Sequence, residues 1–250
     1  YKDPVIGGNS LGKIALRRAI AMAYDSKREV AILHHGQAAR LEMFIPPGVA
    51  GYDPNYRNSV AYDPALANKL LDHFGYRRGA DGYRTMPDGK PLLLTFTREP
   101  ATSSQEMSEL WKRCLDEIGI RSEFVVNNFS DNLKAAIQCK LMLWNVGWTA
   151  VYPEGQNFMQ LLRGPNIGQS NLGCYDSPAY DALYDKAVAL PPGPERNQIY
   201  LQMNRQIEAD SALVLKTTRI RSWLARPWVK GFKKHPILHA EWQYIDVVKH

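Results

Sequence analysis

Three short apolar runs, separated by two segments of helical pattern, constrain the fold of this chain more than any other feature. The runs are LLLTFT (92–97), RSEFVV (121–126) and LMLWNVGW (141–148), and we predict a strand at each. A helix is expected between the first two, capped at Ser103–Glu106 and stopped by Gly119, and another from about Asp131. Strands that alternate with helices favour a parallel or mixed sheet covered on both faces. The pattern therefore predicts an α/β fold.

Helix-start signals recur on both sides of this unit. Apolar residues from Leu11 onward recur at helical spacing, and Ser26 with Glu29 forms a predicted capping box for a second short helix. Asp63-Pro64 and Ser177-Pro178 each place a capping residue before a proline at the first helical position. We expect the first of these helices to carry Leu66, Leu70, Leu71 and Phe74 on one face and to stop at Gly75. A further helix is expected from Pro194, followed by closing strands in ALVLKTT (212–218) and RSWLA (221–225).

The charge balance does not point to nucleic acid. The 250 residues include 31 basic and 25 acidic side chains, a net charge of +6 spread along most of the chain. RIRSWLARPWVKGFKKH (219–235) interleaves basic and aromatic residues, a composition that can stack bases and hold phosphates. The same residues also fit a strand that leads into a packed return segment. We favour the second interpretation and predict no nucleic-acid partner.

Motifs of catalysis and metal binding are incomplete. GGNSLGK (7–13) resembles a phosphate-binding loop, but Ile14 stands where Ser or Thr is required. His34 and His35 are adjacent and so diverge on a helix, and the segment between His235 and His239 contains a proline, so neither pair predicts a metal site. No serine elbow is present, and the carboxylates are scattered over predicted caps and helix surfaces. We predict no enzyme; a hydrolase would require two acids that face one cleft.

The three cysteines, Cys114, Cys139 and Cys174, show no CxxC spacing. They allow at most one internal disulfide, and the pairing stays open. Cys114 falls on the apolar face of the helix after Ser103, where it is expected to pack as a small hydrophobe.

The stretch GWTAVYPEGQNFMQLLRGPN (147–166) begins where the third strand is expected to end. Ligands of open α/β sheets bind beyond the carboxyl ends of the strands. Trp148 and Tyr152 offer rigid aromatic surfaces with a polar handle, and Asn145 and Asn157 offer uncharged donors and acceptors. We predict these four residues to contact a ligand, and Phe158, Leu161 and Leu162 to anchor the following helix in the core.

Seven segments in this order resemble a known family. They are LRRAIAMAYDSKREV, IPPG, GYDPN, YDPALANKLLDHFGY, WTAVYPEGQNF, YDSPAYDALYDKA and RPWVKGF. Their order and character are similar to those of the solute-binding proteins of peptide-type ABC importers, the dipeptide- and oligopeptide-binding class of family 5. The chain resembles the C-terminal half of such a protein.

The resemblance implies a periplasmic-binding-protein-like lobe of type II, with a mixed sheet flanked by helices. Residues 13–235 would form the C-terminal ligand-binding lobe, and residues 1–12 and 236–250 would link it to an N-terminal lobe. It also implies a secretion signal outside this chain, a periplasmic or cell-surface location, no cofactor, and a membrane permease as partner. The function would be to capture a solute and deliver it. The alternative is a ligand-sensing module of a regulatory protein, which a DNA-binding region upstream would favour.

One residue departs from the family pattern. Peptide-binding relatives commonly carry an acidic residue in a motif that resembles GW-x-A-D-Y, where it holds the free amino group of the ligand. This chain has Val151 there, and Glu154 is a candidate substitute. An ammonium group without its carboxylate loses a charge-assisted hydrogen bond, typically ~1.5–3 kcal/mol. We therefore expect a neutral or differently oriented solute, such as a sugar, an opine-like compound or a modified peptide.

Overall fold

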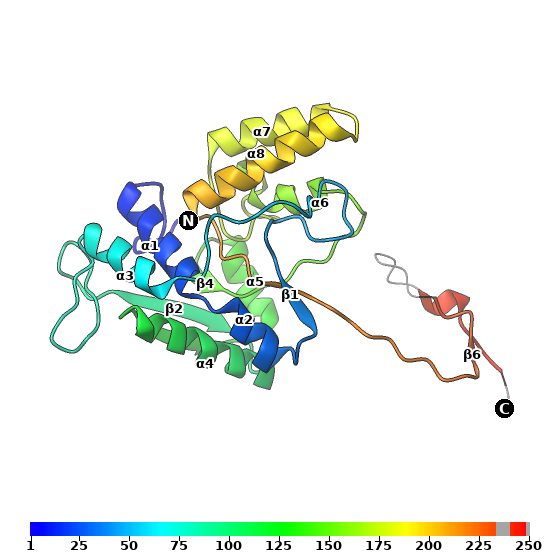
Figure 1. The fold of residues 1–250 in the computed structure, drawn as a ribbon, viewed down its shortest axis with the longest axis horizontal. Coiled ribbons are helices and arrows are strands. Elements are labelled where there is room, and N and C mark those ends of the chain that lie inside the picture. The colour runs from blue at the N-terminus through cyan, green and yellow to red at the C-terminus, as the bar shows by residue number, and fades with distance from the viewer. Residues whose placement is uncertain (234–240, 249–250) are drawn as a thin grey trace.

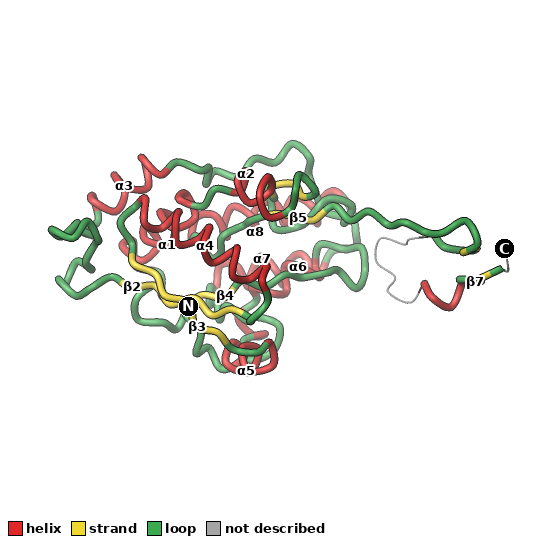
Figure 2. Tube along the Cα trace, turned by 90° about the horizontal axis from the view of Figure 1, so that it is seen from below, coloured by secondary structure: helices red, strands yellow, loops and turns green. Residues whose placement is uncertain are grey.

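A three-stranded parallel sheet with helices on both faces forms the centre of the body. The computed structural model describes residues 1–233 and 241–248. The sheet has the order β3-β2-β4 (Arg121–Val126, Leu93–Arg98 and Leu143–Trp144). Helix α4 (Thr102–Glu117) connects β2 to β3, and α5 (Phe129–Ile137) connects β3 to β4. The two helices lie on opposite sides of the sheet (Figure 2), as right-handed connections that run in opposite directions require.

The α/β class predicted from the alternating pattern is confirmed. The expected third strand is shorter than its apolar run of 141–148, because only Leu143 and Trp144 pair with β2. All three strands of the main sheet are parallel, and the antiparallel ladders form separate two-stranded pairs.

The body contains two apolar cores. The first lies between the sheet, α4, α1 (Leu11–Ala23) and α3 (Pro64–His73), and includes Leu16, Leu71, Leu94, Trp111 and Leu115. The second lies between α7 (Pro178–Ala189), α8 (Pro194–Asp210) and the segment around residues 43–56, and includes Met43, Tyr180, Tyr200 and Met203. Figure 1 shows α7 and α8 side by side, above the sheet-containing part of the molecule.

Two of the proline-based helix starts are confirmed in atomic detail. The Asp63 carboxylate accepts from the Leu66 N–H at 2.8 Å, and the Ser177 hydroxyl oxygen accepts from the Tyr180 N–H at 3.4 Å. Leu66 itself is half exposed, because Ala67 and Leu71 face the core instead. Each cap satisfies a backbone donor that the first turn of a helix leaves unpaired.

Two other predicted caps are wrong. Helix α2 (Ser26–Arg28) is capped by Asp25 rather than Ser26, since the Asp25 carboxylate accepts from the Arg28 N–H. Helix α4 follows Ala101 and has no side-chain cap. The short elements complete the body: π-helix Glu29–Leu33, α6 (Gln156–Met159), and 3-10 turns Gln160–Leu162 and Gly164–Asn166.

The predicted closing strands are largely absent. ALVLKTT is extended only at its end, where β5 (Thr217–Arg219) pairs antiparallel with β1 (Ala38–Arg40). RSWLA forms no strand, because residues 221–225 lie in an arm beyond β5 where the described chain offers no neighbouring strand.

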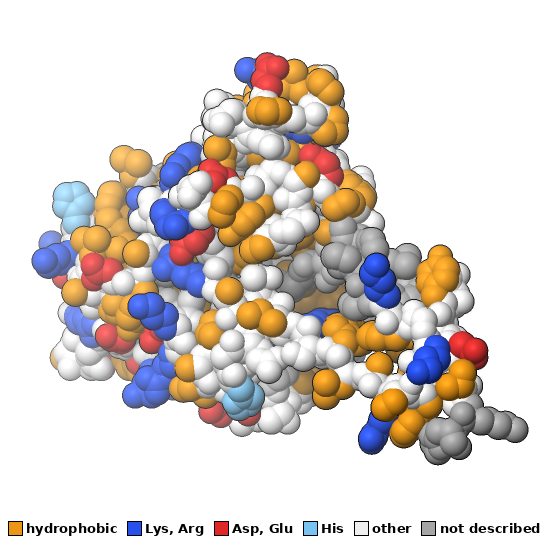
Figure 3. All heavy atoms as spheres, turned by 45° about the vertical axis from the view of Figure 1, so that its right-hand side comes forward, with side chains coloured by type: hydrophobic (Ala, Val, Ile, Leu, Met, Phe, Trp, Pro, Cys, Tyr) orange, Lys and Arg blue, Asp and Glu red, His pale blue; other side chains and the backbone are white. Residues whose placement is uncertain are grey.

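The arm leaves the body after β5 and carries a small ladder of its own. Strands β6 (Val229–Lys230) and β7 (Asp246–Val247) pair antiparallel, and a 3-10 turn spans Glu241–Tyr244. Figure 1 shows this arm extending away from the body, and Figure 3 shows hydrophobic side chains beside Lys and Arg along it.

A disulfide joins Cys139, just after α5, to Cys174, and leaves Cys114 as a buried free thiol. The two Cα atoms lie 5.9 Å apart, and the bond closes a loop over 35 positions of sequence. This loop contains β4 and the whole stretch 147–166. Burial raises the pKa of Cys114, as expected for a packing residue.

Among the helices of the described residues, none combines the length and the apolar character needed to cross a membrane.

Candidate functional site

Two cavities among the described residues bear on function, and the larger of these lies at the carboxyl ends of β2 and β4. It has a volume of about 240 Å³ and opens to the surface. Phe96, Phe124 and Trp111 line its apolar part, and the three rings pack on one another with centroids 5.2 Å apart at each contact. Small-molecule sites typically have ~300–1,000 Å³, so this cavity is the size of part of a site.

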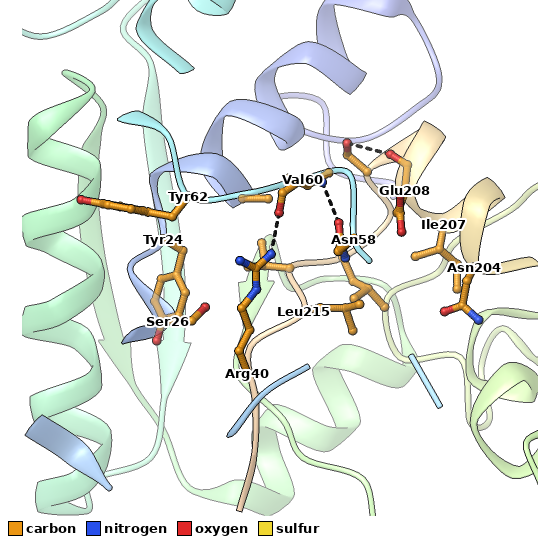
Figure 4. A pocket seen from close by; sticks show the side chains of 14 residues that line it. Tyr24, Ser26, Arg40, Asn58, Val60, Tyr62, Asn204, Ile207, Glu208 and Leu215 are labelled. Atoms are coloured by element: carbon orange, nitrogen blue, oxygen red, sulfur yellow. Dashed lines mark hydrogen bonds between the residues drawn. The ribbon is translucent and has the colours of Figure 1, made fainter. Parts of the chain in front are cut away.

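The smaller cavity is structural. It lies between the two cores and has a volume of about 30 Å³, enough for about one water molecule. Figure 4 shows Arg40, Asn58 and Glu208 around it, with the Arg40 guanidinium donating to the Val60 carbonyl at 2.9 Å. The Glu208 carboxylate accepts from the Tyr56 and Ser59 hydroxyls, at 2.5 and 2.6 Å. Its polar groups are largely paired, and its volume does not admit an organic solute.

Asn145 is the predicted site residue that lines the larger cavity. It lies directly after β4, and its Oδ1 accepts from Lys216 Nζ at 2.9 Å. Lys216 is nearly buried and lies 3.5 Å from the Glu29 carboxylate. Burial lowers the pKa of Lys216 to about 8, with Glu29 opposing the shift. A partly buried ammonium therefore fixes the orientation of the Asn145 side chain.

Glu29 lies at the centre of the network behind Asn145. The Tyr24 and Thr217 hydroxyls donate to its carboxylate at 2.9 and 3.1 Å, and His34 Nε2 lies 3.1 Å away. His34 also lines the cavity. The network ties β5, through Thr217, to the π-helix that carries Glu29.

Charged residues that sequence reasoning missed stand at the rim. Arg98 and Glu99 follow one another at the end of β2, and Arg219 reaches the same cavity from β5. Two donors, Asn132 Nδ2 of α5 and Trp144 Nε1 of β4, reach the Glu99 carboxylate at 3.0 Å each. The signal that could have found these residues is their place directly after a predicted buried strand, where ligands of α/β sheets bind.

Three of the other predicted site residues form a separate group on the stretch after β4. The Trp148 indole donates to Asn157 Oδ1 at 2.9 Å, and the Tyr152 hydroxyl donates to the Gln156 side chain. Trp148 is 43% exposed, whereas Asn157 is fully buried and leaves its Nδ2 unpaired. Asn157 therefore orients the indole from the interior, and Trp148 and Tyr152 are the surfaces that this group presents.

Val151 lies on the surface of the same stretch, 65% exposed. Glu154, the candidate substitute for a missing acid, is engaged inside the protein. Its carboxylate accepts from the Tyr200 hydroxyl at 2.8 Å and the Gln156 N–H at 2.7 Å, and Arg196 lies 3.4 Å away. Burial, followed by the bond to Glu154, raises the pKa of Tyr200. With three partners on its carboxylate, Glu154 is not a free acid for a ligand.

The packing of Gly155 fixes this arrangement. A side chain there would meet Ile45 Cδ1 at 2.5 Å and the Ala50 carbonyl at 2.9 Å. The stretch lies against the loop at residues 45–50, and the Ala50 N–H donates to the Pro153 carbonyl at 3.1 Å. Phe158 and Leu162 are buried beyond it, as predicted, and Leu161 is partly exposed.

The phosphate-loop and metal-site alternatives find no support in the described residues. Lys13 donates to the Pro4 and Val5 carbonyls rather than facing a loop, and His34 faces Glu29. In residues 1–233 and 241–248, no group of three His, Cys, Asp or Glu side chains is placed to hold a metal. His235 and His239 lie outside the described residues.

Comparisons with known proteins identify the family of this chain. The family model described as bacterial extracellular solute-binding proteins, family 5 Middle, matches residues 7–170. Heme-binding protein A of Haemophilus influenzae is 25% identical over 224 residues, which cover 89% of this chain and 40% of that protein.

Two solved structures show the fold. The oligopeptide-binding protein AppA of Bacillus subtilis, in complex with a nonapeptide, superposes with a TM-score of 0.82 at 17% identity. The superposition covers 99% of this chain and 49% of the AppA chain. A mannohexaose-bound oligopeptide-binding protein of Thermotoga maritima gives 0.75 at 21% identity, covering 85% of this chain and 42% of its own. The chain thus spans less than half the length of each of these proteins.

Proposed function

The chain belongs to the bacterial extracellular solute-binding proteins of family 5, and from this membership we propose that it forms the C-terminal lobe of the binding component of an ABC importer. In this role the complete protein captures a small solute between two lobes and passes it to a membrane permease. Closure of one lobe on the other would follow the hinge mechanism common to such proteins.

The observation that carries the proposal is the open cavity of about 240 Å³ at the carboxyl ends of β2 and β4. It combines an aromatic wall with a rim of directional polar groups, which is the composition expected of a solute site. Its size and its opening suit one half of a site whose other half is supplied by a second lobe.

Within that lobe we assign different roles to the predicted residues. Asn145 supplies a polar contact in the cavity, and Trp148 and Tyr152 supply aromatic contact surface from the stretch after β4. Val151 lies between the two aromatic residues in sequence and supplies apolar contact. Asn157 acts by orienting Trp148, because it is fully buried.

The proposed lobe comprises residues 13–235, with residues 1–12 and 236–250 linking it to the rest of the protein. The chain leaves the body after β5, ahead of the proposed boundary (Figure 1), and Ile6 of the N-terminal segment packs in the first core. The boundary at residues 235–236 lies outside the described residues.

The disulfide supports a periplasmic or extracellular location. Disulfides persist in oxidising compartments and are rare in the reducing cytosol. The Cys139–Cys174 bond joins residues 35 positions apart in sequence and closes the loop that carries the stretch after β4.

The nature of the solute follows from the exposed Val151. Relatives of this chain are named for or solved with heme, a nonapeptide and mannohexaose, so the fold accommodates several chemistries. We propose a solute that is neutral at the position of residue 151 or is oriented differently from a peptide held by its amino group.

The test is to identify the solute that the complete protein retains through purification, by native mass spectrometry, and to titrate it back into the emptied protein. The Val151→Asp variant is titrated in parallel with the natural protein, and trialanine is the second ligand titrated into both. We expect a small solute bound at one equivalent, and a gain in trialanine affinity of about tenfold for the variant, the size of one charge-assisted hydrogen bond. Tight binding of trialanine by the natural protein with no gain in V151D would contradict the solute assignment.

A further inference from the structure

The site lacks an acid at position 151, and Glu154 is occupied by Tyr200, Gln156 and Arg196. We propose that Glu99 binds a primary ammonium group of the solute at the carboxyl end of β2. This assignment rests on the proposed function and adds the chemical class of the ligand. The carboxylate that recognises a cation would then stand on the sheet rather than on the stretch after β4.

The first support is the way in which the Glu99 carboxylate is held. Asn132 Nδ2 and Trp144 Nε1 both donate to the same oxygen, Oε1, at 3.0 Å. Within the described residues, Oε2 accepts no hydrogen bond and Glu99 forms no ion pair. One oxygen is thus fixed by neutral donors, which keep the negative charge, and the other is left to accept from a ligand.

The second support is that the buried Asn132 side chain lowers the stability of the fold. Asn132 is fully buried in α5, and its own Oδ1 has no hydrogen-bond partner among the described residues. A buried amide oxygen without a partner destabilises a fold by roughly 1–3 kcal/mol. Such a residue is explained if its function is to hold the Glu99 carboxylate in one orientation.

The third support is the aromatic surface beside the carboxylate. The ring of Trp144, whose N–H reaches Glu99, lies 5.6 Å from that of Phe129, and Phe129 is 55% exposed. An aromatic face near a carboxylate favours organic cations, because the ring quadrupole attracts positive charge. The pair therefore selects for an ammonium group over a neutral hydroxyl.

The neighbouring positive charge does not neutralise this site. Arg98 donates through Nη1 to the backbone carbonyl of Glu99 at 3.0 Å rather than to its carboxylate. Arg219, which also lines the cavity, forms no ion pair with Glu99 in the part of the chain that the structure describes. Glu99 is thus an acid with a fixed orientation and a free charge at the proposed solute site.

The experiment compares amines with their acetylated counterparts in the complete protein. Trialanine, lysine and cadaverine are each titrated by calorimetry beside the derivative in which every amino group is acetylated, together with the solute retained at purification. The variants are E99Q, which keeps an oxygen for Asn132 and Trp144, and E106Q. Glu106 lines the same cavity, is exposed and has no hydrogen bond or ion pair within the described residues, so it is a matched control.

We expect at least one free amine to bind at least tenfold more tightly than its acetylated form. E99Q is expected to remove that preference, and E106Q to retain it. The melting temperature of the unliganded E99Q protein checks that the fold persists.

Three outcomes overturn the inference. The first is that E99Q and the natural protein bind the preferred amine equally tightly. The second is that E99Q and E106Q lose the preference for the free amine to the same extent. The third is a retained solute that carries no cationic group. The last leaves the proposed function standing. If neither the retained material nor any probe binds, the proposed function itself fails.

Discussion

The cavity at the sheet and the stretch that follows it differ in how they are built. The cavity is formed by residues that are distant in sequence, such as His34, Glu99, Asn145 and Arg219, and the Glu99 and Asn145 side chains bond to partners on other elements. In the stretch at 147–157 the exposed aromatic residues bond to near neighbours in sequence: Trp148 bonds to Asn157, and Tyr152 to Gln156. The comparison teaches that the polar groups of the first region are held by long-range contacts, whereas the exposed aromatic residues of the second are held by neighbours in sequence.

The disulfide provides the largest expected effect that separates the two regions. The variant C139S/C174S opens the 35-position loop that contains the stretch, and should lower the free energy of unfolding by about 3 kcal/mol. Both cysteines have φ angles in the left-handed region, +57° and +52°, so the bond also holds an unfavourable backbone.

Hydrogen exchange measures where this loss falls. We expect faster exchange in residues 147–166 and little change in β2 and β3, whose ladder lies outside the loop. The natural protein treated with reductant is the control and should match the double variant. Uniformly faster exchange throughout the sheet would show that the two regions are not separate.

Asn157→Ala tests the internal support of the stretch. The change removes the acceptor of the Trp148 indole and leaves a small void at a fully buried position. We expect a loss of about 1–2 kcal/mol in unfolding free energy, and a shift in tryptophan fluorescence as the indole is released.

The control for this change is Asn145→Ala, which alters the cavity but not the stretch. It should leave the Trp148 environment unchanged and weaken solute binding. A fluorescence shift of equal size in both variants would count against two independently organised regions.

Lys216 offers a pH test of the network behind the cavity. Burial lowers its pKa to about 8 in the folded protein, from an ordinary value of 10.5. Because the unfolded chain binds more protons between these values, its contribution to stability rises with pH across this window and is lost as the pH falls to about 8. The unfolding free energy of the natural protein, minus that of K216M, should therefore increase with rising pH by up to about 1.4 kcal/mol per pH unit in this window.

Urea unfolding at pH 7.5 and 9.5 measures this difference. Lys13 is the comparison site outside this network. Burial also lowers its pKa, but its ammonium donates to the Pro4 carbonyl rather than contacting Glu29. A K216M difference that does not change with pH would show that the ammonium is not buried beside Glu29.

The local sequence pattern predicted most of the helices and strands, and little of the chemistry of the site. The three apolar runs and the Asp63 and Ser177 caps are short-range signals, since strand and cap are decided within a few residues. RSWLA was predicted as a strand because it is apolar, but a strand requires a partner, which the arm lacks among the described residues.

Long-range pairing explains what the sequence could not show. The Cys139–Cys174 bond, the contacts of Glu99 with Asn132 and Trp144, and the capture of Glu154 by Tyr200 depend on the folded arrangement. The aromatic residues at 148 and 152 were visible in sequence, whereas the orientation of Glu99 required the structure. The sequence was thus enough to locate the stretch at 147–157, whereas the cavity at the sheet became visible only in the folded structure.

The most direct test of the central claim is the structure of the complete protein with the solute that it retains at purification. The account predicts solute density at the carboxyl ends of β2 and β4, within hydrogen-bond distance of Asn145 and Glu99, with Trp148 alongside. A solute bound elsewhere, with no contact to the residues of this cavity, would contradict it.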